Sequence, residues 1–171
     1  MAKLGVFLML LTVAMLAAGL FGALHNQVSY TVGPDYFHRF KFRQFAIPPE
    51  VPPRIGAAIV GWRASWWMGL IVGLPPFLLG LLLLSPAGKL WSAGLRAIFV
   101  VFLITALASG IGFAFGLIAV DQEAAAQIAL PETIRNPVGF LRAGAMHDAS
   151  YIGGFVGVFA AIWVIFRASR P

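Results

Sequence analysis

Four long stretches of this sequence contain no Asp, Glu, Lys, Arg or His, and this feature constrains the fold more than any other. They cover residues 4–24, 64–85, 97–120 and 150–166. A helix needs about 20 consecutive apolar residues to cross the hydrocarbon core of a bilayer. The first three stretches have that length, and the fourth reaches it if its helix begins about a turn earlier. The pattern predicts an all-α integral membrane protein, a compact bundle of four transmembrane helices forming one domain over residues 1–171.

The composition supports the same class. Hydrophobic residues make up 60% of the chain and charged residues 11%, whereas about a quarter of the residues of a soluble domain are charged. The chain has no Cys, so disulfides, thiolate metal sites and thiol catalysis are excluded. The net charge of +6 is not accompanied by a glycine-rich phosphate loop or a helix-turn-helix pattern. We therefore expect the cations to decorate membrane boundaries, and we expect no nucleic-acid partner.

The first apolar stretch follows a single cation, Lys3, as the apolar region of a secretory signal does. The stretch is long for a signal, and the segment "AAGLFGALHNQ" at its end has no clear small-x-small cleavage site. We therefore expect an uncleaved signal-anchor that remains as the first membrane span.

The connections between the spans divide the cations unequally. Segments 25–63 and 121–149, called the loop side here, carry seven Lys or Arg in 68 residues. Segments 1–3, 86–96 and 167–171, called the terminal side, carry five in 19. The positive-inside rule is strongest for short segments, so the denser cations predict that both termini are cytoplasmic. The two long loops are then external and carry interfacial segments, as in a bacterial inner-membrane protein.

The loop side also holds every acidic residue and every histidine of the chain, so we expect any functional site there. His25 ends the first stretch and His147 precedes the fourth, which predicts a similar depth for both. His147 and Tyr151 are four residues apart on one helical face, whereas Asp148 points about 100° away. The candidate site comprises His25, Tyr30, Tyr36, His38, His147, Asp148 and Tyr151.

One hypothesis for this site is a metal ion or a haem held by His25 and His147, with Asp148 or His38 completing or orienting the set. No HxxxH or HExxH spacing occurs within any segment, and histidines that cap helices or hydrogen-bond neighbours are commoner than ligands. Imidazoles more than about 12 Å apart could not share an ion, because each metal–nitrogen bond is only about 2 Å long.

The segment "DYFHRFKFRQF" (35–45) combines four Phe with three cations. Residues 28–32 before it alternate like a strand, and neither the helical nor the strand period persists within it. We expect a short helical turn and then extended chain along the membrane surface, where aromatic rings and cations contact headgroups. The alternative is a basic, aromatic wall for an anionic or lipid-like ligand. The predicted lipid-facing anchor comprises Arg39, Lys41, Arg43, Trp62, Trp66 and Trp67.

Glycine and proline predict how the helices are built. Small residues recur every four positions in each stretch, including Gly112 and Gly157, and such rows allow close backbone approach. The Pro75–Pro76 pair in the second stretch predicts a kink or a short unwound segment. The proline-rich segment 46–56 predicts extended chain. Asn136 as cap and Pro137 as first residue predict that the fourth helix begins near residue 137.

Three functions remain open from the sequence. The first is a non-enzymatic subunit or scaffold of a membrane complex, with lipids and other membrane subunits or a second copy as partners. The second is an external-face metal or haem redox protein. The third is a lipid or amphiphile binding protein whose cleft is formed by the interrupted second span and the basic, aromatic loop. Spans without charges disfavour a proton-coupled pump, and no nucleophile motif indicates an enzyme.

Overall fold

The computed structural model describes residues 2–170, and these residues form helices and turns without any strand. Four of the helices are long and apolar enough to span a membrane: α1 (Lys3–Val32), α3 (Pro53–Leu83), α4 (Ala87–Ala119) and α6 (Pro137–Ser169). The connections contain the π-helical segment η1 (Tyr36–Lys41), α2 (Phe42–Gln44) and α5 (Gln122–Ala126). The prediction of an all-α protein with four membrane-spanning helices is confirmed in helix number, length and apolar composition.

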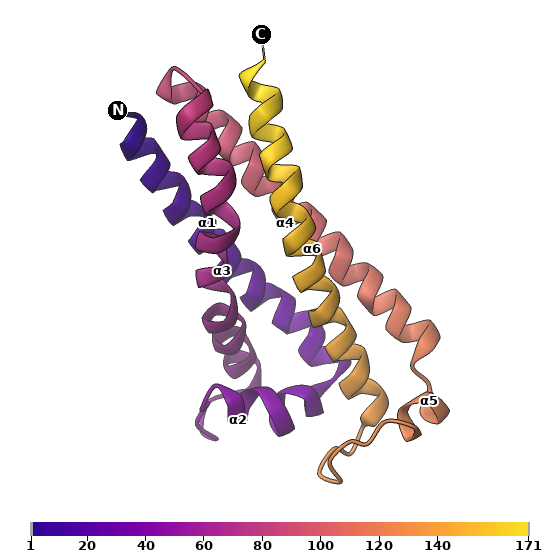
Figure 1. Ribbon diagram of the computed structural model, residues 1–171. Coiled ribbons are helices and arrows are strands. Elements are labelled where there is room, and N and C mark those ends of the chain that lie inside the picture. Colours follow the sequence, from indigo (N-terminus) through magenta and orange to yellow (C-terminus); the bar gives the residue numbers. More distant parts are fainter. Residues whose placement is uncertain (1, 171) are drawn as a thin grey trace.

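The long helices lie side by side as two antiparallel pairs (Figure 1). α1 packs mainly against α3, and α4 packs mainly against α6, while fewer contacts join one pair to the other. The first turn of α1, the last turn of α6 and the α3–α4 connection lie at one end of the bundle (Figure 1). η1, α2 and α5 lie at the opposite end. The terminal side and the loop side of the sequence therefore correspond to the two ends of the bundle.

Glycines bring the two helices of each pair into backbone contact. A Cβ added to Gly112 of α4 would lie 2.5 Å from the Cβ of Ala149 and 2.6 Å from the carbonyl oxygen of Ala145, both in α6. In the other pair, a Cβ on Gly22 or on Gly61 would overlap the backbone of the opposite glycine. Lipid gives helices no hydrophobic reason to associate, so this close van der Waals contact stabilises each pair.

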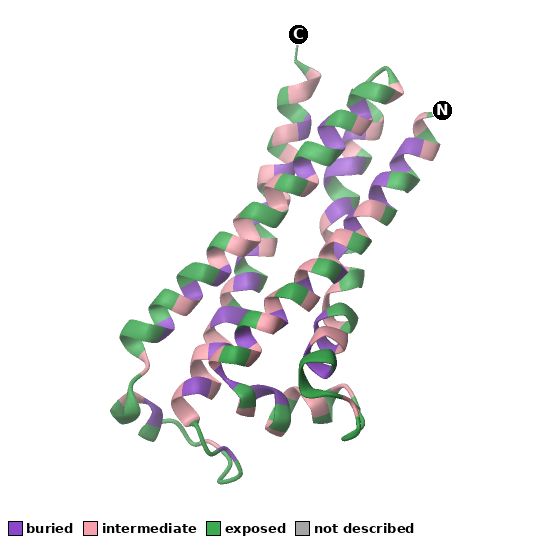
Figure 2. Ribbon diagram, turned by 180° about the vertical axis from the view of Figure 1, so that it is seen from behind, coloured by how far each residue is buried: buried purple, intermediate pink, exposed green. Residues whose placement is uncertain are grey.

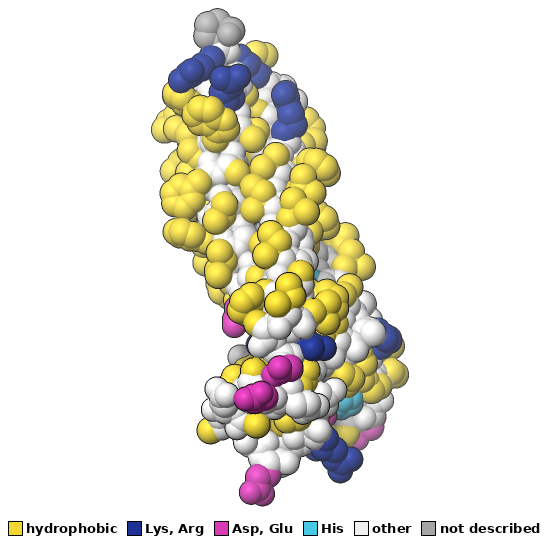
Figure 3. Space-filling view, turned by 90° about the vertical axis from the view of Figure 1, so that its right-hand side faces the viewer, with side chains coloured by type: hydrophobic (Ala, Val, Ile, Leu, Met, Phe, Trp, Pro, Cys, Tyr) yellow, Lys and Arg dark blue, Asp and Glu magenta, His cyan; other side chains and the backbone are white. Residues whose placement is uncertain are grey.

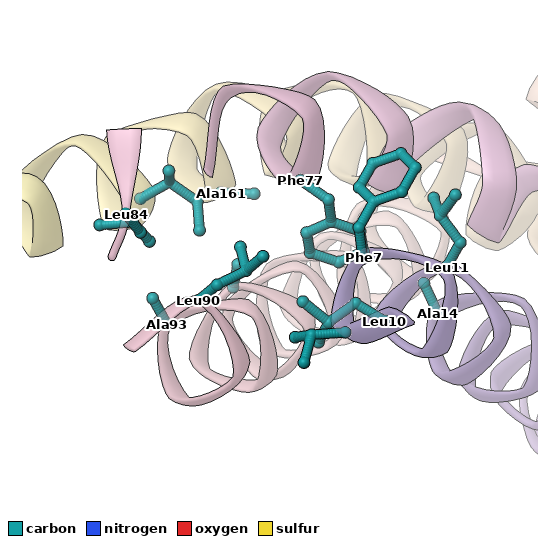
Figure 4. Packing of buried hydrophobic residues seen from close by; sticks show 12 residues of the cluster. Phe7, Leu10, Leu11, Ala14, Phe77, Leu84, Leu90, Ala93 and Ala161 are labelled. Atoms are coloured by element: carbon teal, nitrogen blue, oxygen red, sulfur yellow. The ribbon is translucent and has the colours of Figure 1, made fainter. Parts of the chain in front are cut away.

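An apolar core joins the two pairs near the terminal end of the bundle. Leu10, Phe77, Leu90 and Ile165 come from the four different long helices, and at most 1% of each is exposed. Figure 4 shows Leu10, Phe77 and Leu90 gathered in the space between the helices. Most other large apolar side chains on the long helices face outwards (Figure 2). Helices that are apolar on their outer faces are expected in lipid rather than in water.

The surface separates charge by position along the bundle. Figure 3 shows Lys and Arg at the terminal end, an apolar belt in the middle, and acidic groups and histidine with further cations at the loop end. Because a charged side chain is costly in the hydrocarbon region, this distribution matches integration of the protein into a membrane.

The chain after the first span differs from the prediction. Residues 28–32 continue α1 as helix instead of forming a strand-like stretch. Residues 36–44 are helical throughout, whereas a short helical turn followed by extended chain was predicted. The physical reason is a spacing of five. Tyr36 and Phe37 are buried, Lys41 and Phe42 follow five positions later, and the N–H of Phe42 donates to the carbonyl of Phe37. This i→i+5 pattern fits neither the ordinary helical period nor the strand period.

The proline-containing segments are also more helical than predicted. α3 begins at Pro53, inside the segment 46–56 that was expected to be extended. A proline suits the first turn of a helix, because the N–H that it lacks would have no partner there. α3 also continues through Pro75 and Pro76 without an unwound segment. Neighbouring helices in a membrane bundle support such a helix.

The start of α6 is attached to the first connection. α6 begins at Pro137 as predicted, and the Asn136 side-chain oxygen accepts from the N–H of Gly139 at 2.9 Å. The carboxylate of Asp35 accepts from the N–H groups of Arg135 at 2.6 Å and Asn136 at 2.8 Å. An anion is favourable beside a helix N-terminus, and this one holds η1 against α6.

Candidate functional site: a histidine cluster beside an apolar cavity

His25 of α1 and His147 of α6 are in contact near the loop end of the bundle. Their ring centroids are 4.6 Å apart, and the rings meet edge to face at 90°. At 1.5 Å per helical residue, His25 lies about 33 Å from Lys3, and His147 lies about 30 Å from Arg167. A hydrocarbon core is about 30 Å thick, so a core that begins at these terminal-side cations would end close to both imidazoles.

Each imidazole has a serine partner on a neighbouring helix. Nε2 of His147 is 3.2 Å from Oγ of Ser29 in α1, and Nδ1 of His25 is 3.1 Å from Oγ of Ser109 in α4. Ser29 is fully buried and His147 is only 6% exposed. A buried polar group without a partner is costly, so the serines stabilise the imidazoles and orient their rings.

Aromatic rings enclose the imidazole pair on both sides. Tyr36 of η1 stacks on His147, with ring centroids 4.9 Å apart and 28° between the planes. Phe21 of α1 stacks on His25 at 5.7 Å and 19°. The connection after α1 thus folds back over the two helices. The histidine cluster is defined as His25, Ser29, Tyr36, Ser109 and His147.

The imidazole separation is well within the 12 Å limit for a shared ion, but further ligands are missing. No group of three His, Cys, Asp or Glu side chains able to hold a metal occurs within residues 2–170. A haem between His25 and His147 would need room for the iron and the macrocycle between the two ligating nitrogens, whereas the ring centroids are only 4.6 Å apart. The haem hypothesis does not fit this arrangement, and a metal ion bound by these imidazoles stays a prediction.

Tyr30 and His38 form a second pair, separate from the histidine cluster. The Tyr30 hydroxyl and Nε2 of His38 are 2.9 Å apart, and His38 is exposed. Phe37 lies between the two groups, with its ring centroid 5.4 Å from that of Tyr30 and 6.2 Å from that of His147. The ring of Phe37 therefore separates Tyr30 and His38 from the histidine cluster.

Asp148 and Tyr151 are exposed on α6 beside the cluster. Within residues 2–170, no hydrogen bond or ion pair joins Asp148 to His25 or His147, so Asp148 does not orient either imidazole. Burial raises the pKa of the Tyr36 hydroxyl, and the nearby Tyr151 and Asp148 raise it further. Tyr36 therefore stays protonated at neutral pH and can donate a hydrogen bond.

Two adjoining spaces lie beside the histidine cluster. A small pocket of about 30 Å³, called the polar pocket here, has a mostly apolar wall to which His25, His147 and Lys41 contribute. An apolar cavity of about 120 Å³ lies between the two helix pairs, within the membrane-spanning part of the bundle. The same four residues line both spaces: Phe21, Ser65, Ser150 and Tyr151.

Small side chains make room for the apolar cavity. Ala14 and Ala18 of α1, Gly73 of α3 and Gly154 of α6 all line it. Pro76, in the predicted helix interruption, also contributes to its wall. The small residues that bring helices together within a pair thus leave space between the pairs.

Sequence reasoning missed two residues that shape the site, Ser29 and Ser109. Lys41 was predicted as part of a lipid anchor or of a basic wall for an anionic ligand, and it lines the polar pocket. Ser29 follows His25 by four residues and so shares its helical face, which was a usable signal. Ser109 gave no signal, because only the packing of α1 against α4 brings it to His25.

The other predicted anchor residues are mostly exposed. Trp62, Trp66 and Trp67 are each 40–44% exposed on α3, and Arg43 is exposed on α2. Arg39 is half-buried, and its Nε has no hydrogen-bond partner within residues 2–170. An anchoring function of these side chains at the headgroups stays a prediction.

No family model matches this chain, and comparisons with curated proteins and with solved structures find no similar protein. Any function must therefore be inferred from the histidine cluster, the polar pocket and the apolar cavity.

Proposed function

We propose that this protein binds a membrane amphiphile, with the apolar tail in the cavity between the helix pairs and the polar head at the histidine cluster. One observation carries the proposal: the apolar cavity and the polar pocket adjoin through Phe21, Ser65, Ser150 and Tyr151. Ligand sites are mostly apolar with a few polar groups at defined positions. A site with one apolar part and one polar part matches a molecule built in the same way.

The depth of the two spaces supports this proposal. Ala14, which lines the apolar cavity, lies about 16 Å along α1 from Lys3, near the middle of a 30 Å core. His25, which lines the polar pocket, lies near the boundary. The site therefore extends from the centre of the bilayer to one surface, as a lipid of the loop-side leaflet does.

The other two hypotheses explain less of the geometry. A subunit or scaffold, with other membrane proteins or a second copy as partners, requires neither an internal cavity nor a lysine beside it. A redox metal site requires more ligands than His25 and His147 supply within the described residues. Amphiphile binding uses both features and requires no chemical reaction.

We infer that the protein is a bacterial inner-membrane protein with cytoplasmic termini and an uncleaved signal-anchor in α1. Two loop-side cations support the orientation, because they serve helix ends. Arg54 donates to the carbonyl of Gln27 at 3.3 Å near the end of α1, and Arg142 donates to the carbonyl of Val120 at 2.8 Å at the end of α4. Cations that bind helix carbonyls are explained by that contact, so they are weaker evidence when the cations on the two sides are compared by the positive-inside rule.

The test is whether an amphiphile copurifies with the protein and depends on the cavity. A Cβ at Gly154 or at Gly110 would have nothing within 4 Å, but only Gly154 lines the cavity. Native mass spectrometry should therefore detect a bound amphiphile in the wild type and in Gly110→Leu, and less of it in Gly154→Leu. Absence of any retained amphiphile, or equal retention by both variants, would contradict the proposal.

A further inference from the structure

Lys41 is a half-buried amine that forms no ion pair within the part of the chain that the structure describes. It lies on η1 and lines the polar pocket. Its Nζ donates to the Gln44 side-chain oxygen at 3.1 Å and lies 4.6 Å from the ring centroid of Phe40 and 5.5 Å from that of Tyr36. A lysine ammonium has three donors, and no ion pair joins this one to a carboxylate within residues 2–170. The amine therefore retains unused donors, and its side chain forms part of the pocket wall.

The surroundings of Lys41 favour an added anion. Burial lowers the pKa of Lys41, and the nearby Asp148 only partly opposes this effect. Desolvation disfavours the charged form of an amine, and an opposite charge at short range restores it. Asp148 is exposed, so it does not fill the pocket. An anion inside the pocket would supply the missing partner.

The size of the polar pocket limits the anion that it accepts. A single water needs about 10–15 Å³ of comparable space, so a pocket of about 30 Å³ accommodates two water-sized groups. The two oxygens of a carboxylate meet this limit, whereas the headgroup of a glycerophospholipid is far larger. Ser65 and Tyr151 also line the pocket, and their hydroxyls can donate hydrogen bonds to a carboxylate.

We propose that the amphiphile is a single-chain lipid carboxylate, a fatty-acid-like molecule, whose head binds Lys41 in the polar pocket and whose first chain carbons enter the apolar cavity. This inference rests on the proposed function, since the chain needs the cavity. The Lys41 ammonium supplies the counter-charge, and Ser65 and Tyr151 supply neutral donors.

The test compares two probes that differ only in the head. Radiolabelled hexadecanoate and hexadecan-1-ol are bound to the full-length protein in nanodiscs of neutral phosphatidylcholine, at a pH that ionises the acid. A charge-assisted hydrogen bond predicts that the wild type binds the acid about 10-fold more tightly than the alcohol. Lysophosphatidylcholine with the same chain is expected to compete poorly, because its head exceeds the pocket.

Variants assign the preference to Lys41. Lys41→Gln should bind acid and alcohol equally, and Lys41→Arg should keep part of the preference for the acid. Arg43→Gln is the matched control, because Arg43 is an exposed cation two residues away that does not line the pocket. It should keep the full preference.

The outcomes separate the inference from the proposed function. Equal binding of acid and alcohol by the wild type, or an equal loss of preference in Arg43→Gln, would overturn the carboxylate inference. If the carboxylate inference failed in this way but Gly154→Leu bound less alcohol than the wild type, the amphiphile proposal would stand. If neither probe bound to the wild type, both would fail. If Lys41→Gln misfolds and binds no alcohol, Lys41→Arg decides the question. A preference of Lys41→Arg for the acid would support the inference, and equal binding of acid and alcohol by Lys41→Arg would overturn it.

Discussion

The burial of His25 and His147 depends on one hydrogen bond to each imidazole ring. His25 has one nitrogen beside Ser109 and one buried nitrogen without a partner within residues 2–170. His147 has Ser29 beside its Nε2. A buried imidazole that loses its only partner keeps the full cost of desolvation. The serines are therefore expected to contribute to stability although neither carries a charge.

Ser109→Ala is the sharpest test of this expectation. It leaves both nitrogens of His25 without a partner, and the free energy of unfolding should fall by about 0.5–2 kcal/mol. Ser92→Ala is the control, because Ser92 lies on the same helix but is exposed, and exposed substitutions usually change stability by less than about 0.5 kcal/mol. Unfolding in detergent by denaturant or heat measures both. Equal stability of the two variants would mean that the Ser109–His25 contact contributes nothing.

The sequence predicted part of this site because it predicted that His25 and His147 lie at a similar depth along the bundle. His25 and His147 flank apolar stretches at the same boundary, so their contact followed once α1 and α6 were neighbours. The position of Lys41 did not follow. A turn at Gly33 and the five-residue spacing of η1 fold the connection back over α6, and neither has a period that the sequence displays. The positions of side chains on such a folded-back connection cannot be predicted until the path of the chain is known.

At the scale of helices, backbone contact holds each pair together. A Cβ added to Gly153 of α6 would lie 2.6 Å from the Cβ of Ala108 in α4. Close approach also joins one pair to the other, because a Cβ added to Gly33 at the end of α1 would lie 2.9 Å from the Cβ of Ala143 in α6. The rows of small residues predicted this packing, since each row needs a facing backbone. They did not predict which helices form pairs, because all four helices carry such rows.

Gly112→Leu should separate α4 from α6. The added side chain would overlap Ala145 and Ala149, and overpacking of this kind costs about 1–3 kcal/mol or more. Gly110→Leu makes the same change two residues away, where an added Cβ meets nothing within 4 Å, so it should melt like the wild type. Thermal unfolding in detergent distinguishes the two variants. Wild-type melting of Gly112→Leu would show that this face of α4 does not pack against α6.

At the scale of the whole molecule, the distribution of charge follows the direction of the helices. The C-terminal ends of α1 and α4 lie at the loop end, where free carbonyls attract cations. Arg142 donates to such a carbonyl, that of Val120, whereas Arg54 donates to the carbonyl of Gln27 in the last two turns of α1. Arg63 donates to the carbonyl of Phe45 at 3.1 Å in the first connection. Three of the seven loop-side cations thus donate to backbone carbonyls. This explains why the loop side carries more cations in total although the terminal side carries them more densely.

Reporter fusions test the orientation that follows from this distribution. We expect a reporter that works only in the cytoplasm to be active when fused after residue 171, because the terminal segments carry the denser cations. A reporter that works only outside the cytoplasm should be active when inserted within 121–135, a segment that contains one cation and three acidic residues. Each reporter exchanged to the other site should be silent, which controls for expression and folding. Activity of the external reporter at residue 171 would reverse the orientation and place the histidine cluster and the mouth of the proposed lipid site at the cytoplasmic surface.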